Sequence, residues 1–361
     1  MSHHAARHGA GAIPPAAYRV LLRFPHPEPP RSPRSHVIPV FLPFAGCPER
    51  CVFCNQPAQT GQAQQPLEAL LANARQILAA RAPQSATAEG PRAELAFYGG
   101  TFTALPQHWR REFLALDTQA KAEGIICRAR CSTRPDAISP EILEELRQGG
   151  LDLVELGVQS FADAALSASQ RGYSGATAQK ACLLVRQSGL GLGIQLMPGM
   201  PGHTPTDFAR DAVLAASFQP ELARLYPCLV LSGTPLAELW RGGEYTPWSL
   251  DHTVEALAHA LLTLWAAGVP AARIGLAEED NLPVLAGPRH PALGQMARAQ
   301  ALLLHIQALL PSLSKAPNTL LLPRRLQGEA LGQGNVLALS YAALGLAIRM
   351  WDENVLGLAL A

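Results

Sequence analysis

The feature that most constrains the fold of this 361-residue chain is an alternation of two kinds of segment between residues 36 and 235. Short apolar stretches typical of strands alternate with longer stretches whose apolar residues recur at helical spacing. This order predicts parallel strands joined by crossover helices, and so an α/β fold. The six strand-like stretches are HVIPVFLP (36–43), ELAFYGG (94–100), ICRARCST (126–133), LVELGVQS (153–160), GLGIQLMPG (191–199) and LARLYPCLV (222–230).

Polar and glycine-rich motifs follow several of these strands directly. CSTRPD (131–136), GVQSF (157–161) and PGMPG (198–202) each lie where a predicted strand ends. An open sheet would also fit the alternation, but parallel barrels build their sites at the carboxyl ends of their strands. We therefore predict a partial parallel (β/α)6 TIM-like barrel with its functional site at that rim.

The segments outside this pattern suggest the domain organisation. Residues 1–35 include FPHPEPPRSPRSH, which carries five prolines, and we predict a flexible N-terminal segment there. Residues 36–245 form the predicted core domain. Residues 246–361 contain two long helical patterns, at 249–268 and 290–310, and are predicted to form a mainly helical C-terminal extension packed on the core.

Composition limits the location and the partners of the protein. The net charge is +1, so the chain as a whole offers no electrostatic argument for nucleic acid. No apolar stretch is as long as a membrane span, and the first fifteen residues lack a secretory pattern. With seven cysteines, an odd number, the composition favours a reducing compartment, and we expect a cytoplasmic protein without a membrane partner.

Three cysteines follow the first predicted strand at the spacing C-x3-C-x2-C: Cys47, Cys51 and Cys54. Three thiolates can hold three corners of a [4Fe–4S] cluster and leave one iron open to an incoming molecule. The alternative is a zinc site completed by a distant histidine or cysteine. Cys127 and Cys131 also have C-x3-C spacing, but we expect them to be ordinary residues of a strand rather than ligands of a second cluster.

The cysteine segment CPERCVFC (47–54) resembles the cluster motif of the radical S-adenosylmethionine (SAM) enzymes. The resemblance implies a [4Fe–4S] cluster whose open iron binds SAM, and an electron donor such as flavodoxin or ferredoxin. Reductive cleavage of SAM would then yield a 5′-deoxyadenosyl radical. The family pattern places Phe53 beside the adenine, although a core aromatic is an equally open interpretation. It also places Gly99, Gly100 and Thr101 at the amino group of the methionine moiety.

Further motifs resemble two branches of this superfamily. GVQSF, Arg171 and PGMPG are similar to the oxygen-independent coproporphyrinogen dehydrogenases, which implies that Gln159 and Arg171 hold the ribose or the carboxylate of SAM. TRPD (133–136), MPGMPG (197–202) and RLYPCLVLSGTPLAELWRGGEY (224–245) resemble the catalytic subunit of Elongator, a tRNA-modifying family. The last stretch is long and unusual, so it carries the most weight.

The chain departs from these families at three positions of the motifs. Ser132 and Gln195 stand where the relatives carry carboxylates, and both can still hydrogen-bond a ribose hydroxyl. Arg224 stands where Elongator relatives carry lysine, and we take Arg224 and Tyr226 as candidates for catalysis.

The Elongator subunit continues into an acetyltransferase domain. Residues 246–361 are too few to hold one, and LQGEALGQGN (326–335) is a poor candidate for its pyrophosphate loop. The sequence therefore predicts an Elongator-like core without that domain.

Three functions remain open from the sequence. The favoured one is a radical SAM enzyme acting on an unidentified substrate, either tRNA or a small molecule. A porphyrin-related radical SAM oxidoreductase is disfavoured by the Elongator-like stretch at 224–245. A non-catalytic protein that only binds the cluster or SAM is disfavoured because polar residues that would face SAM are present.

Overall fold

A computed structural model describes residues 18–30, 36–61, 63–81, 93–276 and 282–361. The chain divides into two compact units, one formed by residues 28–293 and the other by residues 1–27 together with 294–361. Each unit is built around a sheet of its own.

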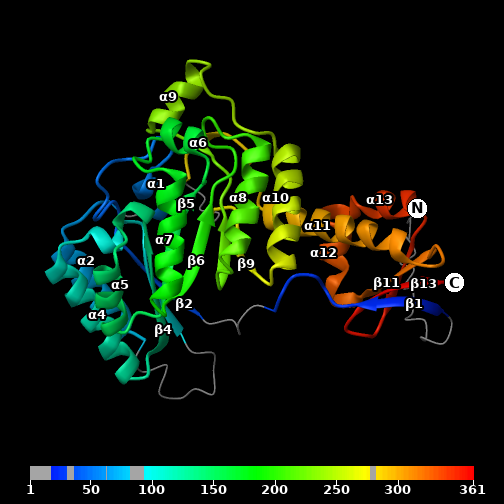
Figure 1. Ribbon diagram of the computed structural model, residues 1–361, viewed down its shortest axis with the longest axis horizontal. Helices are drawn as coiled ribbons and strands as arrows, with labels where there is room; N and C mark the ends of the chain where they lie inside the picture. Colours follow the sequence, from blue (N-terminus) through cyan, green and yellow to red (C-terminus); the bar gives the residue numbers. More distant parts are fainter. Residues whose placement is uncertain (1–17, 31–35, 62, 82–92, 277–281) are drawn as a thin grey trace, which may run out of the picture. The chain divides into compact units, whose positions relative to one another are not determined.

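The larger unit contains a seven-stranded sheet in which every pair of neighbours is parallel (Figure 1). All six predicted strands are present in it, in chain order, and a seventh strand joins after the last. The partial TIM-like barrel predicted from the alternation is therefore confirmed. The strands in order across the sheet are β2 (Val37–Phe41), β3 (Ala93–Tyr98), β4 (Ile126–Thr133), β5 (Leu153–Gln159), β6 (Gly191–Leu196), β7 (Leu222–Leu225) and β9 (Ala271–Ile274).

Helices connect these strands, and local sequence signals set where several of them begin. Ser139 accepts a hydrogen bond from the Ile142 amide at the start of α5, and Thr204 forms a capping box with Asp207 at the start of α8. The described helices of this unit are α1 (Gln56–Thr60), α2 (Leu67–Ala79), α4 (Gln107–Ala122), α5 (Pro140–Gln148), α6 (Asp163–Ala168), α7 (Gly175–Gln187), α8 (Pro205–Ser217), α9 (Pro235–Arg241) and α10 (Leu250–Ala266).

The two faces of the sheet differ in chemistry because side chains alternate along a strand. On β3, the ring of Phe97 packs on Phe113 from α4, with 5.6 Å between ring centroids. On the opposite face, Arg130 from β4 and Glu155 from β5 form a buried ion pair. The helix-covered face is thus apolar, whereas the inner face of the barrel carries polar and charged groups.

The strand β7 is shorter than the predicted stretch 222–230. It ends at Leu225, and after Tyr226 and Pro227 the chain forms the separate strand β8 (Val230–Leu231). This strand pairs with β10 (Val284–Ala286) in a two-stranded antiparallel sheet. The proline accounts for the break, because it cannot donate to a ladder.

The smaller unit is an α/β unit with a four-stranded sheet in the order β1-β13-β11-β12. Leu320 and Leu358 from the sheet pack with Ile306 and Tyr341 from the helices in its apolar core. Its elements are β1 (Arg19–Phe24), α11 (Leu293–Leu309), β11 (Thr319–Pro323), α12 (Gln327–Leu331), α13 (Ala338–Ala343), β12 (Ala347–Trp351) and β13 (Leu356–Leu360).

The structure differs from the predicted N-terminal segment. Residues 19–24 are not flexible but form β1, which pairs antiparallel with β13. Val20, Leu22 and Phe24 alternate as a half-buried strand requires, but the prolines that follow masked this short pattern. Residues 1–17 and 31–35, also part of that prediction, lie outside the described residues.

The C-terminal helices predicted at 249–268 and 290–310 are present as α10 and α11. The chain divides after Leu293, however, and not near residue 246. Strand β9 pairs with β7, which ties the segment after residue 246 to the larger unit. Among the described residues, no helix combines the length and the apolar character that crossing a membrane requires.

Candidate active site at the carboxyl edge of the large sheet

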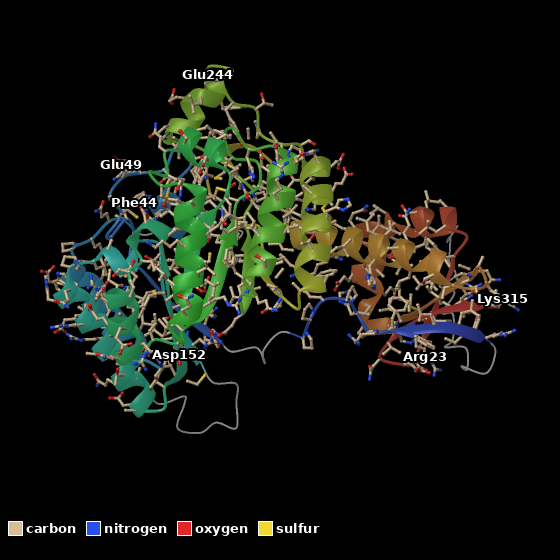
Figure 2. The ribbon with its side chains drawn as sticks, in the orientation of Figure 1. Arg23, Phe44, Glu49, Asp152, Glu244 and Lys315 are labelled. Atoms are coloured by element: carbon tan, nitrogen blue, oxygen red, sulfur yellow. The ribbon has the colours of Figure 1, made fainter. Side chains whose placement is uncertain are left out.

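The loop that carries the three cysteines lies on the turn that follows β3. The Thr101 amide donates to the carbonyl of Ala45 at 2.8 Å. A Cβ atom on Gly46 would lie 2.3 Å from the Thr101 carbonyl, and one on Gly100 would lie 2.2 Å from the Ala45 carbonyl. Both glycines are therefore required for this close contact between backbones. Figure 2 labels Phe44 and Glu49, which flank Cys47 in this loop.

The three cysteines are free thiols and lie near one another. The pKa of the Cys54 thiol is raised to about 12, mainly by burial and in smaller part by the neighbouring Cys51 and Cys47. Burial likewise raises the pKa of Cys47, whose sulfur lies 3.3 Å from the Thr101 hydroxyl. The structure thus brings together the predicted ligands Cys47, Cys51 and Cys54, with Thr101 beside them.

The spacing of these sulfurs bears on which metal they could hold. A tetrahedral zinc ion with Zn–S bonds of about 2.3 Å keeps its sulfur ligands about 3.8 Å apart. Within the described part of the chain, the three cysteine sulfurs do not form a set in which all lie within 4.8 Å of one another. These positions are therefore not those of a closed single-ion site, and three thiols of this kind suit three corners of a [4Fe–4S] cluster.

A buried arginine contacts the middle cysteine. Arg171 is 4% exposed, and its Nη1 donates to the Cys51 sulfur at 2.9 Å. Its other donors bind the carbonyl of Gly157 and the hydroxyl of Tyr173, and among the described residues it has no carboxylate partner. A buried cation needs an anion nearby. The site is therefore built to receive negative charge, which thiolates bound to a metal cluster would supply.

A second arginine lies close to the first. Arg134 follows β4, and its guanidinium is paired with the Asp136 carboxylate by two hydrogen bonds of 2.9 and 2.8 Å. It also donates to the Arg171 carbonyl, and its Nη1 lies 4.0 Å from the Cys51 sulfur. The TRPD motif thus places a second, carboxylate-paired cation beside the same cysteine.

The predicted SAM residues at the ends of β5 and β6 also meet. Gln159 adopts φ +66°, a left-handed conformation unusual for a residue other than glycine, and is buried. Its side-chain carbonyl accepts a hydrogen bond from the Gln195 amide at 3.1 Å. Backbone strain of this kind gathers at functional sites, so it supports a role for Gln159 at the rim.

Two other predicted residues have surroundings that are less specific. Phe53 is 7% exposed and packs in an apolar cluster with Met200, Val230 and Leu236, as a core aromatic would. Ser132 is half-buried on β4, opposite Glu155 in the register of the sheet. Their contacts with SAM stay predictions.

Inside the barrel, Arg224 is the centre of a polar network. Its guanidinium contacts both carboxylate oxygens of Glu155, and it donates to the hydroxyls of Tyr226 at 3.0 Å and Tyr98 at 2.7 Å. Glu155 also accepts from Arg130, which in turn pairs with Glu94. Two arginines and two glutamates leave this network without net charge.

Sequence reasoning did not identify Tyr98, Glu155 or Tyr173 as site residues, and it did not predict that the Arg134 guanidinium lies near Cys51. Tyr98 and Glu155 occupy inward positions of strands, where alternation could have identified them. Tyr173 lies two residues after Arg171, but no local pattern indicates that its hydroxyl binds that arginine.

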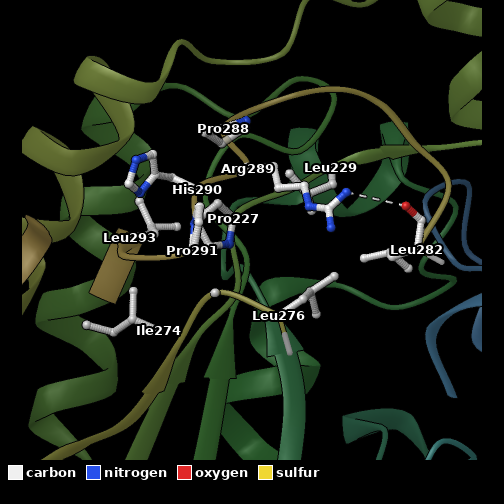
Figure 3. A pocket seen from close by; sticks show the side chains of 11 residues that line it. Pro227, Leu229, Ile274, Leu276, Leu282, Pro288, Arg289, His290, Pro291 and Leu293 are labelled. Atoms are coloured by element: carbon white, nitrogen blue, oxygen red, sulfur yellow. Dashed lines mark hydrogen bonds between the residues drawn. The ribbon is translucent and has the colours of Figure 1, made fainter. Parts of the chain in front are cut away.

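A separate cavity of about 40 Å³ lies where β7 and β9 end (Figure 3). Its walls are mostly proline and leucine side chains, and Arg289 and His290 supply its polar groups. The Nδ1 of His290 accepts from the Ala292 amide, which leaves Nε2 as the donor. Pro227 also lines it, immediately after the candidate Tyr226.

Sequence comparison identifies the family that this geometry suggests. The profile of the radical SAM superfamily matches residues 41–215, and that of the radical SAM C-terminal domain matches residues 220–303. The chain belongs to the radical SAM superfamily. It is accordingly an enzyme of this class, and the cysteines, the β3 turn and the barrel lie within the matched region.

Two curated relatives and one solved structure specify the branch. A tRNA uridine(34) acetyltransferase of Methanocaldococcus infernus is 31% identical over 259 residues, which is 62% of this chain and 48% of that protein. Elongator complex protein 3 of Homo sapiens is 26% identical over 242 residues, 60% of this chain and 43% of that protein. The structure of archaeal Elp3 from M. infernus matches with a TM-score of 0.55 at 25% identity, covering 73% of this chain and 62% of that one.

These matches confirm the resemblance to the Elongator branch seen in the motifs. The chain spans about half the length of the curated relatives it matches. The acetyl transfer in the name of the archaeal relative is therefore a property of that longer protein.

Proposed function

We propose that this radical SAM enzyme holds a [4Fe–4S] cluster on Cys47, Cys51 and Cys54 and binds SAM at the remaining iron. When bound, the cluster supplies an electron that cleaves SAM and generates a 5′-deoxyadenosyl radical. The observation that carries the proposal is Arg171, a buried cation placed on the Cys51 sulfur and lacking a carboxylate partner among the described residues.

Different residues around the cysteines would position the cysteine loop and bind SAM. The Thr101 hydroxyl lies within hydrogen-bond distance of the Cys47 sulfur, and the close contact between the backbones of Gly100 and Ala45 fixes the position of the cysteine loop. Gln159 and Gln195 form a hydrogen-bonded pair at the ends of β5 and β6, where their remaining donors and acceptors suit ribose hydroxyls. An electron donor such as flavodoxin or ferredoxin would reduce the cluster.

The interior network suggests where a substrate would lie. Arg224 uses its donors on Glu155, Tyr98 and Tyr226, so it orients the two phenols rather than acting as a free base or nucleophile. This role fits arginine and not the lysine of the Elongator relatives, because an ammonium has three N–H donors and cannot bond all four oxygen atoms. Tyr226 and Tyr98 are then the groups offered to the substrate.

The name of the archaeal relative favours tRNA as the substrate. A tRNA uridine(34) acetyltransferase and Elongator complex protein 3 match the region that contains the barrel. We therefore propose an RNA substrate, with a small molecule as the second candidate, for an enzyme of the cytoplasm.

Iron analysis tests the cluster. Protein reconstituted without oxygen should hold about four irons and show a brown chromophore. Alanine at Cys47, Cys51 or Cys54 should abolish the chromophore, whereas Cys127→Ala, which removes an exposed thiol, should keep it. Zinc in place of iron, in protein purified without oxygen, would show that the proposal is wrong.

SAM turnover and isotope transfer test the chemistry. Reduced protein should convert SAM to 5′-deoxyadenosine, and a protein that only binds SAM would not. Adding tRNA from cells grown in deuterated medium should place deuterium in the 5′-deoxyadenosine. If deuterium appears only with the small-molecule fraction of the same cells, the RNA proposal is wrong.

A further inference from the structure

We propose that Arg171 and Tyr173 together form a positioning device that hydrogen-bonds the Cys51 sulfur and raises the reduction potential of the cluster. The inference rests on the proposed function, because it needs a cluster on that cysteine. It assigns Tyr173 a role, and it gives Arg171 a task directed at the cluster in addition to the SAM contact that the family resemblance implies.

The guanidinium of Arg171 is held at several points. Its Nη2 donates to the Gly157 carbonyl at 2.6 Å, and its Nε and Nη2 donate to the Tyr173 hydroxyl at 3.0 and 2.8 Å. These contacts fix the plane of the group, and Nη1 then points at the Cys51 sulfur at 2.9 Å. The hydrogen bond to sulfur is therefore set by the fold and not by the free rotation of a long side chain.

Tyr173 is itself fixed. Its hydroxyl lies 3.0 Å from the carbonyl oxygens of both Gly157 and Val158, so its single hydrogen goes to the end of β5 while its oxygen accepts from Arg171. Its ring lies under both cations, 5.1 Å from the Arg171 guanidinium carbon and 5.4 Å from that of Arg134. The phenol thus holds Arg171, and no hydrogen bond of the described residues joins the phenol itself to Cys51.

The two arginines beside Cys51 are not equivalent. Arg134 is neutralised by Asp136, and its Nη1 is 4.0 Å from the sulfur. Arg171 has no such partner among the described residues and approaches to 2.9 Å. The charge that the cluster would experience most strongly is therefore that of Arg171.

The sign of the effect follows from charge. Reduction adds an electron to an already anionic cluster, so a cation and an N–H donor at a ligand sulfur stabilise the reduced form more than the oxidised form. Weakening this contact should therefore make the reduction potential more negative.

The same geometry limits what Arg171 can offer to SAM. A guanidinium has five N–H donors, and the contacts above use four of them. The one that remains on Nη1 can reach a carboxylate with a single hydrogen bond, but the two-point fork that grips a carboxylate most tightly is not free. We therefore expect the loss of Tyr173 to change the potential more than the affinity for SAM.

The test compares Tyr173→Phe and Arg171→Gln with wild type. Each protein is reconstituted without oxygen, its midpoint potential is measured by redox titration followed by electron paramagnetic resonance, and its SAM dissociation constant is measured by calorimetry. A matched control is Tyr341→Phe, which removes a buried hydroxyl that has no hydrogen-bond partner within the described residues and belongs to the other unit.

Both site variants should shift the midpoint to more negative values, Arg171→Gln further than Tyr173→Phe, and Tyr341→Phe should match wild type. SAM affinity of Tyr173→Phe should fall by no more than a few fold. Wild-type midpoints in both site variants, with SAM affinity reduced tenfold or more, would overturn the inference and make Arg171 solely a SAM residue. Absence of a [4Fe–4S] cluster from wild type is a different result, which would refute the proposed function and this inference with it.

Discussion

Replacing Glu155 by glutamine tests whether the interior network is required for the stability of the barrel. Glu155 is 4% exposed, and its two oxygens accept from Arg224, Arg130 and Tyr98. Glutamine keeps the size of the side chain but removes the charge, and it turns an N–H group toward donors. Arg130 would still have Glu94, whereas Arg224 would lose the only carboxylate partner that the described residues give it.

The expected cost follows from this imbalance. Removing one partner of a buried ion pair typically costs about 3–5 kcal/mol, because the other charge is left in a poorly solvating environment. For a unit of this size, each kcal/mol lowers the melting temperature by about 2–4 °C. Glu155→Gln should therefore lower the melting temperature of the larger unit by roughly 6–20 °C.

Scanning calorimetry on cluster-free, reduced protein measures this shift. Glu221→Gln is the matched control. Glu221 pairs with Arg128, which lies on β4 like Arg130, but the side chains of Glu221 and Arg128 are 46% and 28% exposed. An exposed pair contributes at most about 1 kcal/mol, so the control should move by a few degrees or less. If the two variants melt at the same temperature, the buried network does not stabilise the barrel, and the reasoning is refuted.

Three further predictions concern the cysteine loop, the pH dependence and acetyl-CoA. Gly100→Ala should lower the iron content after reconstitution, because its Cβ would lie 2.2 Å from the Ala45 carbonyl. The control Gly328→Ala should bind iron normally, because no neighbour of its Cβ among the described residues is closer than 3.7 Å. Equal iron contents in the two variants would contradict the close packing at Gly100. Burial raises the pKa of Asp117 from 3.8 to about 7 against the opposing effect of Lys121. The folded state therefore holds a proton that the unfolded state releases, and the stability this provides is lost as pH rises from about 4 to 7. Asp117→Asn should flatten that part of the melting profile, and an unchanged slope would show that Asp117 is ionised in the fold. We expect residues 1–361, loaded with the cluster, to show no saturable binding of acetyl-CoA by calorimetry, because LQGEALGQGN is a poor pyrophosphate loop, and micromolar binding would overturn this expectation.

Much of the barrel follows from local sequence. Strands such as ICRARCST and the Ser139 cap of α5 are specified within a few residues, because side-chain alternation and capping are short-range effects. The cysteine spacing likewise indicates three candidate ligands without reference to the fold, since all three lie in one loop. These features led to the barrel, the cluster motif and the family.

The contacts that define the chemistry of the site depend on long-range packing. Arg171 reaches Cys51 across 120 positions of sequence, and Arg224 reaches Tyr98 across 126. Nothing local distinguishes an arginine bound to a sulfur from one bound to a carboxylate of SAM. Only the arrangement of the strand ends decides which polar groups are buried together and must therefore form hydrogen bonds or charge pairs with one another.

The pairing of β1 with β13 likewise depends on residues that are far apart in the sequence. RVLLRF near the start of the chain has a weak strand pattern, and its partner Leu356–Leu360 lies at the opposite end. The strand is stable because sheet formation buries its apolar side chains and pairs its backbone groups with β13. The sequence by itself determined the order of elements and the three candidate cysteine ligands, since those depend on neighbouring residues. Only the tertiary structure decided the partners of β1, Arg171 and Arg224, since burial makes hydrogen bonding and charge pairing obligatory among residues that are distant along the chain.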